Sequence, residues 1–167
     1  FKYHGKKKGC IDANGVQGLN SNLRGECGNL QNQDLGEADL ENKNLKGANL
    51  RGTDLSRANL KGALLVGAML AEATLTRTDL READLTNADL SSAHISNSKL
   101  QKANLTGTNF NEAIIRNTDM REAKVSQAKF SKAILFGVNM SGLDLTNLDL
   151  TGAEISSSNL SDAILKG

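Results

Sequence analysis

Acidic side chains recur through this sequence at intervals of five residues, and two neighbouring carboxylates can act as general acid and general base. Asp34, Asp39 and Asp54 each precede an apolar residue, and Asn44 and Asn49 occupy the same place in other intervals. Catalysis needs carboxylates at a few particular positions, whereas a place that Asp and Asn share along the chain serves the architecture. Side chains of this kind bond neighbouring backbone in turns. We therefore assign these residues a structural role.

Other residues with catalytic or ligand chemistry are sparse. The two histidines, His4 and His94, stand far apart in the sequence. The chain contains no G-x-S-x-G motif, no phosphate-binding loop and no H-E-x-x-H motif. The sequence therefore predicts a protein that is not an enzyme, with no catalytic residue, no cofactor and no metal site.

Cys10 and Cys27 are the two cysteines of the chain. A disulfide between them would close a loop and contribute roughly 3 kcal/mol, so we favour this interpretation. Two free thiols packed as small hydrophobic side chains are the alternative. A zinc site with His4 and Asp12 is a third hypothesis, but the C-x16-C spacing matches no common ligand pattern. A disulfide would place the protein in an oxidising compartment.

The element that positions all these residues is a strict repeat. Every fifth residue from Leu30 to Leu165 is apolar, over twenty-eight consecutive repeats without an insertion. On an α-helix five residues rotate about 500°, so these side chains would spread over all sides. In a flat strand, residues five apart point to opposite faces. The apolar residue can always face inward only if the chain turns a corner in each repeat, which predicts a solenoid.

The flanking residues identify the kind of solenoid. A small residue, commonly Ala, stands two places before each apolar centre and also faces inward. The runs ADL, ANL and TDL, and the segment GANLRGTDLSRANLKGALL, resemble the pentapeptide repeat family, A(D/N)LXX, over residues 30 to 165. This resemblance implies an all-β fold, a right-handed quadrilateral (square) β-helix with four repeats per coil.

A weaker twenty-residue period favours four repeats per coil. It relates Phe110 to Phe130 and aligns the hydroxyl series Thr78, Ser98 and Thr118. Residues twenty apart would lie on the same face of successive coils. We therefore expect the two rings to stack in the core and the three hydroxyls to point inward and bond the backbone.

The rhythm divides the chain into two regions. Residues 1–29 break it and are expected to form an N-terminal cap containing the disulfide. Residues 30–167 form the β-helix, regular over about 35–140 and less certain over 141–165. Val138, Leu143 and Leu148 are large where small residues are the rule, so the square must widen or its regularity must weaken after about residue 137. A short helix begun by Ser161 is an alternative for the C-terminal end.

The resemblance and the charge indicate the class of function. Some pentapeptide repeat proteins inhibit or protect DNA gyrase by imitating DNA, which requires a strongly negative surface. Here the whole chain carries a formal charge of +1. DNA mimicry is therefore the less favoured alternative. Nucleic-acid binding is not expected, since Phe110 and Phe130 are predicted to be buried. The favoured function is a structural and interaction scaffold that presents flat faces to a protein partner of unknown identity.

The cellular location follows from weaker signals. No apolar stretch is long enough to span a bilayer. The expected disulfide and the Phe at position 1, which fits the removal of an export signal, favour an exported protein. Resemblance to exported members of the family implies the thylakoid lumen or the periplasm. A cytoplasmic protein, with a trimmed N-terminus, is the alternative.

The candidate interface is a set of apolar residues at outward places. Ile114 and Ile134 stand one coil apart where Asp or Asn is the rule, with Phe136 two residues further along and His94 in the same column. Contiguous exposed apolar side chains mark interfaces, here with a partner or through weak self-association. A second candidate contains Leu64, Val66 and Met69 and would straddle a neighbouring corner. Isolated apolar surface residues are also ordinary, so both patches remain hypotheses.

Overall fold

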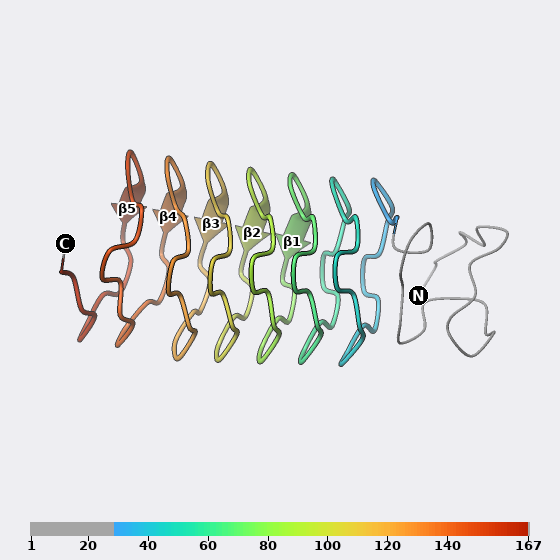
Figure 1. Ribbon diagram of the computed structural model, residues 1–167, viewed down its shortest axis with the longest axis horizontal. Coiled ribbons are helices and arrows are strands. Elements are labelled where there is room, and N and C mark those ends of the chain that lie inside the picture. Colours follow the sequence, from blue (N-terminus) through green and yellow to red (C-terminus); the bar gives the residue numbers. More distant parts are fainter. Residues whose placement is uncertain (1–28, 167) are drawn as a thin grey trace, which may run out of the picture.

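The computed structural model describes residues 29–166, which form a parallel β solenoid (Figure 1). Every bridge joins residues twenty apart in parallel, from Asn29 with Asn49 to Asp144 with Ile164. Four repeats therefore make one coil, as the twenty-residue period predicts, and the described residues make about seven coils. Residues 29–166 contain no helix, and so none that could cross a membrane. The expected cap and both cysteines, Cys10 and Cys27, lie outside the described residues.

One side of the solenoid carries all the regular strands among these residues (Figure 1). They form one parallel sheet in the order β1-β2-β3-β4-β5, with successive strands paired in register. The strands are β1 (Thr74–Thr76), β2 (His94–Ser96), β3 (Ile114–Arg116), β4 (Ile134–Phe136) and β5 (Glu154–Ser156). The middle residue of β1 to β4 is buried, and its two neighbours face outward. We call this side of the solenoid, with centres Leu35 to Ile155, the strand face.

The corners explain the polar places of the repeat. The second residue after each centre has a positive φ at most corners, where it is Gly, Asn, Ser, Gln or a charged residue. At a typical corner the Ala58 N–H donates to the Leu55 carbonyl at 3.0 Å. The Asp before the centre accepts from the following corner: Asp54 Oδ1 bonds the Ser56 N–H at 2.9 Å, and Asp34 does the same with Gly36. The structural role predicted for these acidic residues is thus confirmed.

The core consists of stacked Leu and Ala side chains. Phe110 and Phe130 are buried within it and stack on one another, as predicted, with ring centroids 5.0 Å apart. This stack lies on the fourth side of the coil, whose centres run from Leu30 to Leu150. The twenty-residue period therefore gave the correct register for the core.

The hydroxyl column is also buried and satisfied by the backbone, as expected. Thr78 Oγ1 donates to the Leu55 carbonyl at 2.8 Å, and Ser98 Oγ donates to the Leu75 carbonyl. The Ser98 hydroxyl also accepts from the Thr78 N–H at 3.1 Å. At most other corners the N–H three residues after the centre donates to the carbonyl of the centre. Here the Thr78 N–H and the Leu75 carbonyl both bond the Ser98 hydroxyl of the next coil instead.

The C-terminal coils weaken in one place. Val138 and Leu143 are buried, and the bridge that would join Lys124 to Asp144 is absent. Ala123, one coil before Leu143, is 8% exposed, whereas most alanines at this place are fully buried. Leu143 stands here one coil after Ala123, whereas the bridges beside Val138 and Leu148, from Asp119 to Asn139 and from Lys129 to Asp149, are retained. Weaker regularity beyond about residue 137 stays a prediction.

The short helix considered for the C-terminal end is wrong. Ile164 bridges Asp144, and the Ala163 N–H donates to the Leu160 carbonyl at 3.0 Å, as at other corners. Asp162 has a φ of 59°, a left-handed conformation that a right-handed helix does not contain. The coil therefore continues through this segment and leaves Leu165 62% exposed.

Candidate protein-binding face

The structure brings the four candidate interface residues together on the strand face. His94, Ile114 and Ile134 are successive partners in the sheet, so their side chains form one outward column. Phe136 lies beside this column at the other end of β4 and is 44% exposed. Ile114 and Ile134 are half-buried, and His94 is exposed. We call Ile114, Ile134 and Phe136 the Ile–Phe patch.

Local sequence explains why this patch lies on strands. In the first coils Asp34 and Asp54 occupy the outward place and bond the backbone of their own corner, and only isolated bridges form there. From Thr74 onward other side chains take this place, and the β-branched ones favour extended backbone. The patch is therefore supported by the five-stranded sheet that the described residues form.

Two neighbours of the patch were not singled out from the sequence. Arg116 pairs with Phe136 across β3 and β4, and Glu154 continues the outward column beyond Ile134. Both stand twenty residues from a patch residue, so the same period could have identified them. They place a positive and a negative side chain at the border of the apolar surface.

The second candidate patch is smaller. Leu64, Val66 and Met69 are all half-buried and belong to a single coil. Leu64 lies between Asn44 and Asp84 in its column, and Met69 lies between Asn49 and Asp89. Polar residues therefore limit this patch to one coil, whereas the Ile–Phe patch extends over two.

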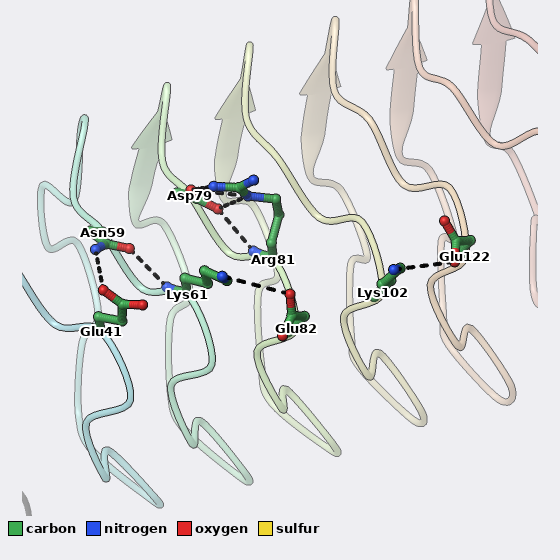
Figure 2. Close-up of polar contacts among 8 residues, drawn as sticks. All are labelled: Glu41, Asn59, Lys61, Asp79, Arg81, Glu82, Lys102 and Glu122. Atoms are coloured by element: carbon green, nitrogen blue, oxygen red, sulfur yellow. Dashed lines mark hydrogen bonds and ion pairs between the residues drawn. The ribbon is translucent and has the colours of Figure 1, made fainter.

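The neighbouring face carries charged side chains in alternating order, which sequence reasoning did not note. We call this side, with centres Leu40 to Leu160, the ladder face. The Lys61 Nζ lies 3.8 Å from Glu82 Oε1, and the Lys102 Nζ lies 3.8 Å from Glu122 Oε2. Figure 2 shows both pairs. Each pair joins residues of successive coils. A twenty-residue offset combined with opposite charge could have found Lys102 and Glu122, whereas Lys61 and Glu82 are twenty-one residues apart and follow only from the structure.

Two closer ion pairs lie within single coils of the same face. Arg81 approaches Asp79 to 2.5 Å (Figure 2), and Arg121 approaches Asp119 to 2.7 Å. The hydrogen bond from Arg81 lowers the pKa of Asp79, and Arg121 lowers the pKa of Asp119 in the same way. These carboxylates are held ionised, so they suit surface ion pairs and not proton transfer near neutral pH.

A groove with a charged wall is another surface feature of the described residues. A shallow groove of about 690 Å³ lies along one edge of the strand face, where Glu37 and Arg57 pair at 3.2 Å and Ser56 and Arg77 line the wall. Within residues 29–166, no cluster of His, Asp and Glu is suited to a metal ion. The strongest feature for recognition is therefore the apolar patch on the strand face.

The parallel coils of twenty residues and the five-residue repeat define a class of protein, and sequence comparison agrees. The family model of the pentapeptide repeat region matches residues 73–150, and the family model of pentapeptide repeats in eight copies matches residues 29–62. A pentapeptide repeat protein of the Arabidopsis thaliana thylakoid lumen is 30% identical over 71% of this chain and 68% of its own, with a TM-score of 0.33. The chain belongs to the pentapeptide repeat family.

Two further solved structures match this chain. QnrB1, a plasmid-mediated fluoroquinolone resistance protein, is 21% identical over 83% of this chain and 90% of its own, with a TM-score of 0.51. A pentapeptide repeat protein from the cyanobacterium Cyanothece 51142 is 22% identical over 82% of this chain and 90% of its own, with a TM-score of 0.44. No curated protein matches the chain.

Proposed function

We propose that this protein is a non-enzymatic scaffold that binds a protein partner through the Ile–Phe patch. The observation that carries the proposal is the stacking of Ile114 on Ile134 beside the exposed ring of Phe136. Apolar surface that is contiguous over two coils, at places where the repeat normally has Asp or Asn, is a candidate for burial in a complex.

The scaffold supports binding because its surface is preorganised. Successive strands of the strand face are hydrogen-bonded in register on a buried Leu and Ile column. A partner would therefore meet side chains whose backbone is already ordered, which lowers the entropic cost of association. Phe136 is the natural anchor, because aromatic side chains contribute strongly to protein interfaces.

The charge distribution favours this proposal over DNA mimicry. The strand face carries four acidic and three basic residues, and the ladder face carries seven acidic and five basic residues. The third face, with centres Leu45 to Leu165, carries two acidic and four basic residues. The fourth face, with centres Leu30 to Leu150, carries four acidic and three basic residues. No face is continuously acidic, whereas an imitation of duplex DNA needs a dense row of negative charge. Regulation of DNA gyrase is therefore the weaker alternative.

The compartment is part of the same proposal. We infer that the protein is exported to the thylakoid lumen or the periplasm, because the two cysteines of the chain are suited to a disulfide in an oxidising environment. A relative from the Arabidopsis thaliana thylakoid lumen supports this location. A cytoplasmic location remains the alternative, and reduced cysteines in the isolated protein would favour it.

Affinity capture with a matched pair of variants tests the binding face. The double variant Ile114→Asp/Ile134→Asp places the common residue of the repeat at both positions, so we expect the coil to be retained and the specific partner to be lost. The control Leu64→Asp/Met69→Asp makes the same chemical change at the same repeat place on other faces. Circular dichroism verifies folding of both variants. A partner that the folded Ile114→Asp/Ile134→Asp variant retains at wild-type level would refute this binding face.

A further inference from the structure

We propose that the strand face binds a second copy of this chain, with the two solenoids antiparallel. This inference rests on the proposed function, since it uses the Ile–Phe patch, and it commits to one occupant for that patch. The outward residues along β2 to β5 follow an order that is complementary to its own reverse.

The arrangement requires a two-fold axis that runs parallel to the strands, between β3 and β4. Rotation about it places β3 of one copy opposite β4 of the other, and β2 opposite β5. Ile114 then faces Ile134 of the second copy, and the reverse contact forms by symmetry. The two isoleucine columns therefore bury one another at the centre of the contact.

The flanking residues are matched by the same rotation. Arg116 faces Phe136 of the second copy, which suits a cation–π contact over the ring that is 44% exposed in the single chain. His94 faces Glu154 of the second copy, where an imidazole N–H can donate to the carboxylate. His94 and Glu154 are both exposed in the single chain, so their side chains are accessible for this hydrogen bond.

The other way of pairing two strand faces lacks this match. A two-fold axis along the solenoid would place each strand opposite the same strand of the second copy. The first residue of one strand would then face the third residue of the other. Ile114 would then face Arg116, and Glu154 would face Ser156. This pairing desolvates the Arg116 guanidinium against an aliphatic side chain, which costs free energy. The cation–π contact of Arg116 and the hydrogen bond between His94 and Glu154 thus select the antiparallel orientation.

The size of the face sets the strength of the association. Each of the four strands involved presents two outward side chains, together with one residue at the corner. A standard stable interface uses roughly 20 to 30 residues on each side, about twice this number. The self-association is therefore weak and depends on protein concentration.

Sedimentation analysis over a concentration series, with charge-swap variants, tests the proposal. Glu154→Lys places an amine opposite His94 of the second copy, and His94→Glu places a carboxylate opposite Glu154 of the second copy. Each single variant removes the matched contact at both ends of the interface, so each should weaken dimerisation by at least about threefold. The double variant His94→Glu/Glu154→Lys restores opposite charges in the antiparallel dimer and should recover association to the wild-type level or above. Ile114→Asp/Ile134→Asp should abolish it, and Leu64→Asp/Met69→Asp should leave it unchanged.

Two results would overturn the inference. One is a wild-type protein that remains monomeric up to about 1 mM, where even a contact worth about 4 kcal/mol would be half formed. The other is a dimer in which the double charge swap is no better than the single variants, since this excludes the antiparallel orientation. A monomer that still loses its captured partner on Ile114→Asp/Ile134→Asp substitution would leave the proposed scaffold function standing without self-association.

Discussion

Phe110 and Phe130 stack inside the solenoid, one coil apart, with ring centroids 5.0 Å apart and planes inclined by 8°. This relationship is imposed by the coil, because residues twenty apart occupy the same position on successive turns. The two rings fill a column that Leu occupies in the earlier coils of this side. Because the two rings are in contact, we expect the changes in unfolding free energy on replacing each ring to be non-additive.

Replacing Phe110 with Ala should lower the free energy of unfolding by about 3 to 5 kcal/mol, because it removes a buried ring and leaves a cavity. Phe110→Leu restores the residue that is usual at this place and should cost less. Equilibrium denaturation in urea measures both changes. Equal losses for the two variants would show that the cavity is not the cause.

Ser98→Ala should lower the free energy of unfolding by about 1 to 3 kcal/mol, because the Leu75 carbonyl and the Thr78 N–H would lose their partner in a buried place. Ser126→Ala removes the hydroxyl of an exposed serine and is the matched control, with a change within about 0.5 kcal/mol. Denaturation of both variants under the same conditions gives the difference. Similar effects at the two sites would contradict the role of the buried hydroxyl.

Gly62 and Gly67 form a natural comparison, since both have a positive φ, 65° and 64°. Gly67→Ala should cost about 1 kcal/mol through the left-handed backbone alone, because open space surrounds its Cβ position. Gly62→Ala should cost more, since its Cβ would come within 2.2 Å of Asn42 Oδ1 and that side chain must move. Thermal denaturation compares the two variants, and an equal decrease in stability would indicate that the Asn42 contact is unimportant.

The ion pair between Asp79 and Arg81 should make stability depend on acid pH. Because the pKa of Asp79 is lowered in the folded protein, its contribution is present above the ordinary value of 3.8 and is lost as the pH falls through the folded pKa. Asp79→Asn should therefore reduce the slope of unfolding free energy against pH below about pH 4. The effect is small, because the pair is partly exposed. Denaturation at a series of pH values measures the slope, and an unchanged slope would argue against the pair.

We propose that residues 1–29 cap the solenoid and that Cys10 and Cys27 are joined. Mass spectrometry of the protein isolated without reductant should find no thiol that reacts with an alkylating agent, and two after reduction. Reduction should expose the amides of residues 1–29 to hydrogen exchange more than those of the later coils, because the coils hold their own hydrogen bonds. Alkylation of both cysteines in the native protein would refute the disulfide.

The sequence determined the architecture because the repeat has a period that only a solenoid can bury. The apolar centres, the inward Ala residues, the Phe110–Phe130 stack and the Thr78, Ser98 and Thr118 column were all predicted from spacing, since every coil imposes the same geometry on residues twenty apart. The column of Ile114 and Ile134 followed from the same rule.

Tertiary structure alone decided the features that depend on contacts between particular side chains of adjacent coils. The regular strands occur on the strand face, and at Leu75 the Ser98 hydroxyl of the next coil replaces the usual turn hydrogen bond. The bridge between Lys124 and Asp144 is absent where Leu143 stands one coil after Ala123. The C-terminal segment remains a coil because Asp162 adopts a left-handed conformation, and the charges of the ladder face pair according to the reach of individual side chains. A repeat pattern specifies which residues share a column, whereas the local turn and the side-chain volumes determine how tightly neighbouring coils join.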